Sequence, residues 1–190
     1  PASDQRNNEN QSNVYPEMQQ LKAAGFTTVR LYGDPGKTWI ATIQAAKALG
    51  MGVVYQVALT NGAYDTDQFK KVIGYVGSKT FQDVVKLIIV GNEQIVAPND
   101  KKTAGAIVAA VKAVRKIMRS EGLTMPVSSS IQADVWLGSD QPGRKDVADA
   151  IDYMGINVYP YQWGVDVNKA VTDANTQHSL AWYIESLKDI

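Results

Sequence analysis

The stretch Leu87-Ile88-Ile89-Val90-Gly91-Asn92-Glu93 joins an uninterrupted apolar run to a glycine, an amide and a carboxyl group. A run without alternation between apolar and polar residues is typical of a parallel strand that is covered on both faces. Barrels and open sheets of the α/β class build their active sites at the carboxyl ends of such strands. Apolar surroundings would keep a carboxyl group protonated near neutral pH, so Glu93 is a candidate general acid. The alternative is that Glu93 only opens the following loop as a solvated residue.

Helical and strand-like patterns alternate along the rest of the chain, after a polar segment at 1–13 that we expect to be a loop. Apolar residues at helical spacing predict helices around Val14–Leu21, Ile40–Leu49, Phe69–Val76, Ile107–Met118, Val147–Ile151 and Leu180–Leu187. Strands are predicted at Phe26–Tyr32, Val53–Leu59, Leu87–Val90, Val127–Ile131 and Tyr153–Val158. Repeated βα units predict a parallel sheet with right-handed crossovers, in a single domain that covers 1–190.

The composition excludes several classes of function. Lys and Arg number 19 and Asp and Glu number 19, so no net field favours nucleic acid or an anionic membrane surface. The chain has no cysteine, which excludes disulfides, thiolate metal sites and a cysteine nucleophile. No apolar run approaches the roughly 20 residues of a membrane span. We therefore expect neither a nucleic acid nor a membrane as a partner.

Polar and aromatic side chains follow the carboxyl end of every predicted strand. In strand order they are Arg30, Tyr32 and Asp34; Gln56 and Asn61; Asn92, Glu93 and Gln94; Ser128, Ser130, Gln132, Asp134 and Trp136; and Asn157, Tyr159, Tyr161 and Trp163. The carboxyl ends of parallel strands share one rim, so this set predicts a single cleft. Sugars hydrogen-bond through their edges and pack their C–H faces on aromatic rings, which makes a carbohydrate cleft the favoured interpretation. For any one aromatic residue, core or rim packing is the alternative.

Other chemistries lack the residues that they need. The single histidine, His178, precludes a multi-histidine metal site, and we expect it at the surface or at a helix start. Ser128-Ser129-Ser130 lacks the G-x-S-x-G elbow of serine hydrolases. No strand is followed by G-x-G-x-x-G or a P-loop, so nucleotide binding has no support. We expect no cofactor and no metal.

Three ordered motifs resemble glycoside hydrolase family 17: Val29-Arg30-Leu31-Tyr32-Gly33, Ile89-Val90-Gly91-Asn92-Glu93 and Ile156-Asn157-Val158-Tyr159-Pro160-Tyr161. The resemblance covers the chain from about Val14 to Ile190. That family contains β-1,3-glucanases and β-1,3-glucanosyltransferases, folds as a (β/α)₈ TIM barrel and acts with retention of configuration. The resemblance implies that the five predicted βα units are barrel strands two to six.

The resemblance also implies roles for individual residues. Glu93 would be the acid/base, and Asn92 would bind the sugar hydroxyl next to the reacting carbon. Arg30 and Tyr32 would support the site, Tyr159 would lie near the nucleophile, and Tyr161 and Trp163 would line sugar subsites. Asn157, in the third motif, is expected among the substrate-binding residues. The resemblance further implies a β-1,3-glucan substrate and a location outside the cell or in the cell wall.

One catalytic part is missing from the motif pattern. Retaining hydrolysis needs a second carboxylate about 5–5.5 Å from the first. In the family this nucleophile is a Glu in a Glu-Thr-Gly-Trp-Pro-like motif at the seventh strand, and no such motif occurs here. Glu185 falls within a predicted helix and is expected to be a solvated residue rather than a substitute. We therefore expect the chain to be part of a longer polypeptide that supplies the first strand, the last two strands and the nucleophile.

Three functions remain open at this point. The favoured one is a retaining β-1,3-glucan-active enzyme, either a hydrolase or a glucanosyltransferase, which would share every catalytic residue. The second is a glucan-binding pseudoenzyme that keeps the cleft and lacks the nucleophile. The third is an unrelated α/β enzyme whose motifs match by coincidence.

Overall fold

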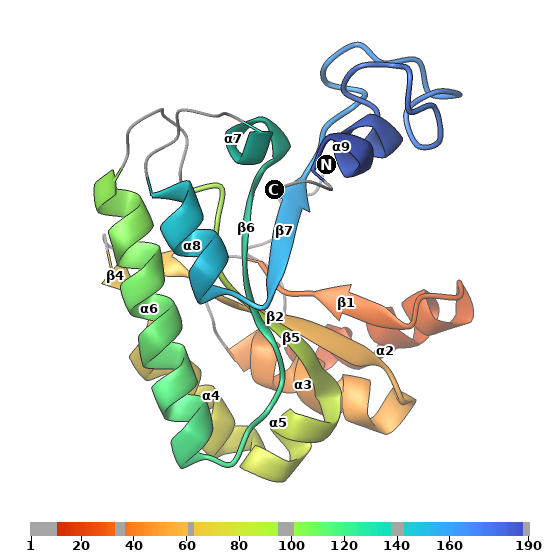
Figure 1. The fold of residues 1–190 in the computed structure, drawn as a ribbon. Helices are drawn as coiled ribbons and strands as arrows, with labels where there is room; N and C mark the ends of the chain where they lie inside the picture. The colour runs from red at the N-terminus through yellow and green to blue at the C-terminus, as the bar shows by residue number, and fades with distance from the viewer. Residues whose placement is uncertain (1–10, 33–36, 61–62, 95–100, 138–142, 188–190) are drawn as a thin grey trace.

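The computed structural model describes residues 11–32, 37–60, 63–94, 101–137 and 143–187, and its centre is a curled parallel sheet (Figure 1). The five strands lie in the order β1-β2-β5-β6-β7, and every adjacent pair is parallel. Their bounds are β1 Thr28–Arg30, β2 Gly52–Val57, β5 Val85–Asn92, β6 Val127–Gln132 and β7 Tyr153–Asn157. The parallel order confirms the repeated βα units that the sequence predicts.

Helices connect the strands and cover the outer face of the sheet. They are α2 Gln11–Ala23, α3 Lys37–Leu49, α4 Thr66–Val76, α5 Ser78–Val84, α6 Lys101–Ser120, α7 Ala133–Leu137, α8 Arg144–Ala150 and α9 Leu180–Ser186. Tyr55 of β2 shows how the two layers join, because its buried ring contacts Trp39 of α3, Phe69 of α4 and Phe81 of α5. Residue 55 faces the helices, so Gln56 turns toward the inner face of the curl, where the site lies.

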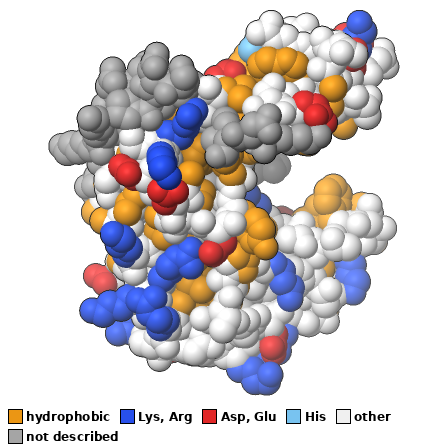
Figure 2. Space-filling view, viewed as in Figure 1, with side chains coloured by type: hydrophobic (Ala, Val, Ile, Leu, Met, Phe, Trp, Pro, Cys, Tyr) orange, Lys and Arg blue, Asp and Glu red, His pale blue; other side chains and the backbone are white. Residues whose placement is uncertain are grey.

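The curl leaves one side of the molecule hollow (Figure 2). Among the residues that the structure describes, β1 pairs only with β2 and β7 pairs only with β6. The arm formed by α2 and β1 faces the arm formed by β7, α9 and the segment between them (Figure 1). Five strands curled in this way form a portion of a barrel, as the family resemblance implies.

Several elements differ from the sequence-based prediction. Residues 11–13 belong to α2 rather than to a loop, because nothing in Gln11-Ser12-Asn13 breaks a helix whose next turns bury Val14 and Met18. Three short elements were not predicted: α5, α7 and a hairpin of β3 (Leu59–Thr60) with β4 (Ala63–Tyr64). Each is too short to show a periodic pattern. Asp34 and Asn61, expected on the rim, lie outside the described residues.

Buried serines and a glycine hold β6 tightly between its neighbours. Ser129 Oγ donates to the Val90 carbonyl of β5 at 2.8 Å, and Ser128 Oγ donates to the Tyr153 carbonyl of β7 at 2.6 Å. A Cβ atom on Gly155 of β7 would lie 2.5 Å from the Ser129 carbonyl oxygen. Only glycine therefore permits β7 to approach β6 this closely.

We predict that Gly155→Ala destabilises the fold by about 1–3 kcal/mol, because the added methyl group meets backbone atoms that cannot rotate away. Urea unfolding of the complete protein measures the change. Gly74→Ala is the matched control: Gly74 lies exposed in α4 with nothing within 4 Å of a new Cβ, so this change should stabilise by up to about 1 kcal/mol. Equal effects of the two substitutions would contradict the steric explanation.

Candidate active site

The end of β5 places Glu93 by an unusual backbone path. Gly91 has φ 73° and Glu93 has φ 53°, and the Glu93 N–H donates to the Ser130 carbonyl of β6 at 2.7 Å. A side chain on Gly91 would meet the Tyr64 ring and hydroxyl at 3.0 Å, so the hairpin residue Tyr64 packs directly over the turn. A positive φ is costly for a residue such as Glu and persists only where neighbouring structure enforces it. The strand end is therefore shaped to present this carboxyl group.

Two donors hold the Glu93 carboxylate. Asn157 Nδ2 donates to Oε1 at 2.9 Å, and the Tyr159 hydroxyl donates to the same oxygen in a short hydrogen bond. Glu93 is half-buried, and the amide of Asn157 and the phenol of Tyr159 bind its carboxylate. Both donors bind Oε1, and no described residue donates a hydrogen bond to Oε2.

Asn157 connects the parts of the site. Its Nδ2 also donates to Asn92 Oδ1 at 3.0 Å, while its Oδ1 accepts a hydrogen bond from Ser130 Oγ at 2.5 Å. Ser130 is buried, so the donor that fixes the orientation of this amide is itself fixed. The sequence predicted that Ser130 and Asn157 lie on the rim. The structure shows that they form a chain of hydrogen bonds that ends at Glu93.

Two hydrogen bonds to its side-chain oxygen, Oδ1, orient Asn92. Arg30 Nη2 donates to Asn92 Oδ1 at 2.8 Å, so this oxygen has two donors and the Asn92 amide nitrogen is directed away from them. Arg30 also lies 4.2 Å from the centre of the Tyr32 ring, which places a cation over an aromatic face. Burial lowers the pKa of Arg30, against the opposing influence of Tyr32, Tyr159 and Glu93. The structure thus brings Arg30, Tyr32, Asn92, Glu93, Asn157 and Tyr159 together.

The remaining predicted aromatic residues occupy different positions. Trp163 packs edge-on against Tyr159 with ring centres 5.8 Å apart, so it adjoins the cluster. Tyr161 is 87% exposed and points into solvent rather than into the Glu93 cluster. Trp136, also on the predicted rim, is fully buried, and its indole N–H donates to the Gly155 carbonyl at 3.0 Å. Core packing is therefore the correct interpretation for Trp136.

Tyr64 is a site residue that sequence reasoning missed. The dipeptide Asn61-Gly62 is the strongest short signal for a two-residue hairpin, and it would have placed Tyr64 beside the end of β2. The contact between Tyr183 of α9 and Asp134 of α7 was also missed, because no periodic pattern relates residues 49 positions apart.

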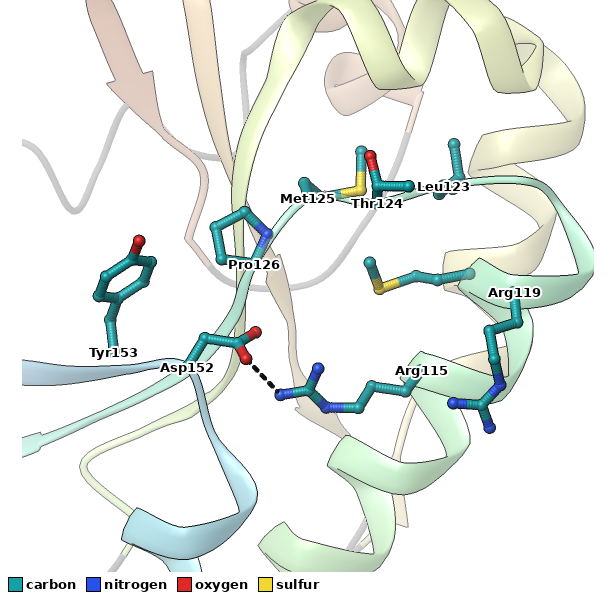
Figure 3. Close-up of a pocket in the computed structure, with 9 residues that line it drawn as sticks. Arg115, Arg119, Leu123, Thr124, Met125, Pro126, Asp152 and Tyr153 are labelled. Atoms are coloured by element: carbon teal, nitrogen blue, oxygen red, sulfur yellow. Dashed lines mark ion pairs between the residues drawn. The ribbon is translucent and has the colours of Figure 1, made fainter.

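A hollow of about 520 Å³ lies at the opposite end of the sheet and belongs to the scaffold (Figure 3). Arg115 of α6 pairs with Asp152 at 3.0 Å beside Pro126 and Tyr153. Burial tends to raise the pKa of Asp152, but hydrogen bonds from the Val127 N–H and Arg115 outweigh it and hold the pKa below its usual range. This ion pair fastens α6 to the amino end of β7, far from the rim that carries Glu93.

The described part of the chain contains no group of three or more acidic, histidine or cysteine side chains suited to a metal ion. His178, expected at the surface or a helix start, is half-buried and directly precedes Ser179, the N-cap residue of α9. None of the described helices combines the length and the apolar character needed to cross a membrane.

The sequence of the BtgE/BtgC glycoside hydrolase domain family matches residues 1–188 of this chain. The chain belongs to this family. Membership in a glycoside hydrolase family agrees with the carbohydrate cleft inferred from the strand ends, and with the resemblance that the three motifs carry.

Curated relatives are fungal and considerably longer than this chain. The probable β-glucosidase btgE of Aspergillus clavatus is 25% identical over 173 residues, which are 90% of this chain and 28% of that protein. The glucan endo-1,3-β-glucosidase btgC of Emericella nidulans is 28% identical over 166 residues, 84% of this chain and 24% of that protein. The chain spans about a quarter of the length of these relatives.

Solved structures of β-glucan hydrolases share the fold. CJP38, a β-1,3-glucanase and allergen of Cryptomeria japonica pollen, matches with a TM-score of 0.66 and 17% identity over 92% of this chain and 64% of that one. A plant β-glucan endohydrolase matches with a TM-score of 0.60 and 19% identity over 85% of this chain and 56% of that one. These similarities confirm the predicted fold class, a portion of a (β/α)₈ barrel.

We predict that Tyr159 ionises at unusually high pH because of Glu93. The hydrogen bond to Glu93, together with burial and the charge of that carboxylate, raises the pKa of Tyr159 to about 12. Glu93→Gln removes the charge, which would otherwise repel a phenolate, so the pKa should fall toward about 10. Carbon-13 NMR of ring-labelled tyrosine in the complete protein measures the midpoint, with Tyr159→Phe assigning the signal. The exposed Glu17 of α2 supplies the control, since Glu17→Gln should leave the midpoint unchanged. A midpoint unmoved by Glu93→Gln would contradict the assignment.

Proposed function

We propose that this chain is the acid/base-bearing part of a retaining β-1,3-glucan-active enzyme, with Glu93 as the general acid/base. The observation that carries the proposal is the set of donors on one oxygen of Glu93. Asn157 and Tyr159 both occupy Oε1, so Oε2 is the oxygen that carries a proton to the glycosidic oxygen and later takes one from water. A fixed orientation of the carboxyl group is what general acid catalysis requires.

The neighbouring side chains support roles in binding the sugar. With Asn92 Oδ1 held by Arg30 and Asn157, the Asn92 amide nitrogen is available to donate to a hydroxyl of the sugar that reacts. Tyr159 keeps its proton at neutral pH and so remains a donor to Glu93. Tyr32, Tyr161 and Trp163 supply aromatic faces for the C–H faces of further glucose residues.

The nucleophile belongs to the same proposal. Within the described residues, the groups that bind Glu93 are an amide and a phenol, and no second carboxylate takes part. Retention requires a carboxylate about 5–5.5 Å from Glu93. We assign this role to a Glu beyond residue 190, on a barrel strand that would follow β7.

The relatives support the proposed substrate class, because one of them is named glucan endo-1,3-β-glucosidase. The proposed substrate is a β-1,3-glucan polysaccharide or oligosaccharide, and residues 1–190 form a single, partial catalytic domain of the complete protein. Glucanosyl transfer is included, because a sugar in place of water as acceptor requires no other catalytic group. The proposed location, the extracellular space or the cell wall, is the one that the family resemblance implies.

We predict that Glu93→Gln lowers kcat/KM of the complete protein on laminarin by about 10²–10⁴-fold, because unactivated glucan needs a proton on its leaving oxygen. With an aryl β-glucoside whose leaving group is an acidic phenol, the rate of the first step, glycosylation of the enzyme, should fall far less. Azide should then restore turnover and form a β-glycosyl azide, since a small anion needs no general base to attack the glycosyl-enzyme.

Glu17→Gln, the same chemical change on the exposed face of α2, should retain full activity. Wild-type turnover of laminarin by the Glu93→Gln protein would refute the assigned role. Laminarin binding without release of sugar by the complete wild-type protein would favour the pseudoenzyme instead.

Product length separates hydrolysis from transfer. When the complete protein acts on a single laminarin oligosaccharide, we predict that transfer is marked by products longer than the substrate, whereas hydrolysis gives shorter products only. Mass spectrometry of the products decides between the two, and the Glu93→Gln protein serves as the blank.

A further inference from the structure

His178 shares a rare backbone conformation with Glu93. These are the two non-glycine residues with positive φ in the described ranges, 67° for His178 and 53° for Glu93. Such a conformation costs free energy and is concentrated at functional sites, where surrounding contacts enforce it. At Glu93 the positive φ orients the candidate acid, and at His178 it orients an imidazole ring.

Tyr183 and Asp134 fix the tautomer of the His178 ring. The Tyr183 hydroxyl lies 2.6 Å from Asp134 Oδ1 and 2.8 Å from His178 Nδ1. Burial and the hydrogen bond to Asp134 raise the pKa of Tyr183, so the phenol keeps its single proton and donates it to the carboxylate. Nδ1 must then be the donor to the phenol oxygen. A neutral His178 therefore carries its proton on Nδ1 and has a lone pair on Nε2, to which no described residue donates a hydrogen bond.

Aromatic rings flank this imidazole. Trp163 lies 5.4 Å from the His178 ring and Trp182 lies 5.6 Å from it, and all three rings are half-exposed. Trp182 lies in the first turn of α9, where its backbone N–H donates to Ser179 Oγ at 3.0 Å. A hydrogen-bond acceptor between half-exposed indole rings matches what a sugar offers, a hydroxyl edge and a C–H face.

The ring cluster is connected to the acid by contact. Trp163 packs on Tyr159, and the Tyr159 hydroxyl binds Glu93, so the cluster continues from the candidate site toward the outer end of the β7–α9 arm. This arm overhangs the hollow side of the molecule in Figure 2. A glucan chain bound at Glu93 that extends along the arm passes Trp163 before it reaches His178.

We propose that His178 and Trp182 form a distal sugar-binding subsite, which accepts a hydroxyl of a remote glucose residue on Nε2 and packs its C–H face on the indole. The proposal rests on the function proposed above. The Asp134–Tyr183 pair acts as the positioning element, because it sets which ring nitrogen faces the sugar.

Chain length provides the test. The complete wild-type protein, His178→Asn and Trp182→Ala are assayed on β-1,3-gluco-oligosaccharides of increasing length. Asn tolerates positive φ, so His178→Asn removes the imidazole without opposing the backbone. We expect both variants to lose about three- to tenfold in kcat/KM on long oligosaccharides and to match wild type on the shortest one that is cleaved. Tyr75→Ala, which removes an exposed ring from α4, is the control and should match wild type at every length.

Each other outcome overturns the subsite. An unchanged length profile in both variants shows that no sugar is bound there. An equal loss at every length shows that the rings act only by supporting Tyr159 and Glu93. Thermal unfolding identifies a variant that fails to fold, in which case the other variant decides. A wild-type protein inactive on all lengths overturns the proposed function as well, whereas an active wild type with unchanged variants overturns the subsite alone.

Discussion

The hydrogen bonds of one amide, Asn157, hold the candidate site together. Its nitrogen binds Asn92 at 3.0 Å and Glu93 at 2.9 Å, and its oxygen is bound by Ser130 at 2.5 Å. These residues come from β5, β6 and β7, so the amide can make all three bonds only if the three strands keep their register. The close approach of β7 to β6 over Gly155 provides that register. The packing that fixes the register of the sheet therefore also fixes the position of the Glu93 carboxyl group.

The sequence predicted the elements in which a buried pattern repeats. Leu87–Val90 indicated a covered parallel strand, and the structure extends it to Val85–Asn92, with Ile88–Gly91 buried. The apolar stripe of α6 was equally readable, because a helix that packs along its whole length must repeat its apolar residues. The hairpin β3–β4 and the helices α5 and α7 span too few residues for any period to appear, and tertiary contacts determine them instead.

The site shows a similar division. Residue type and position at the carboxyl ends of the strands placed Arg30, Asn92, Glu93 and Asn157 on one rim, because the carboxyl ends of parallel strands meet at the same edge. The individual hydrogen bonds among these side chains could not be predicted from the sequence. The apolar run predicted the covered body of β5, whereas the hydrogen-bond partners of Glu93 come from β6, β7 and the turn after β7.

The two positive-φ residues show how such a site distributes its strain. Glu93 is held by a backbone bond to Ser130 and by side-chain bonds to Asn157 and Tyr159. His178 is held by Tyr183, which is fully buried and bound to Asp134. Each unfavourable backbone conformation is thus maintained by groups anchored in the scaffold, so the free energy of folding supplies the orientation before any substrate binds. A glucan that meets both residues meets preformed geometry, and binding need not include the cost of ordering them.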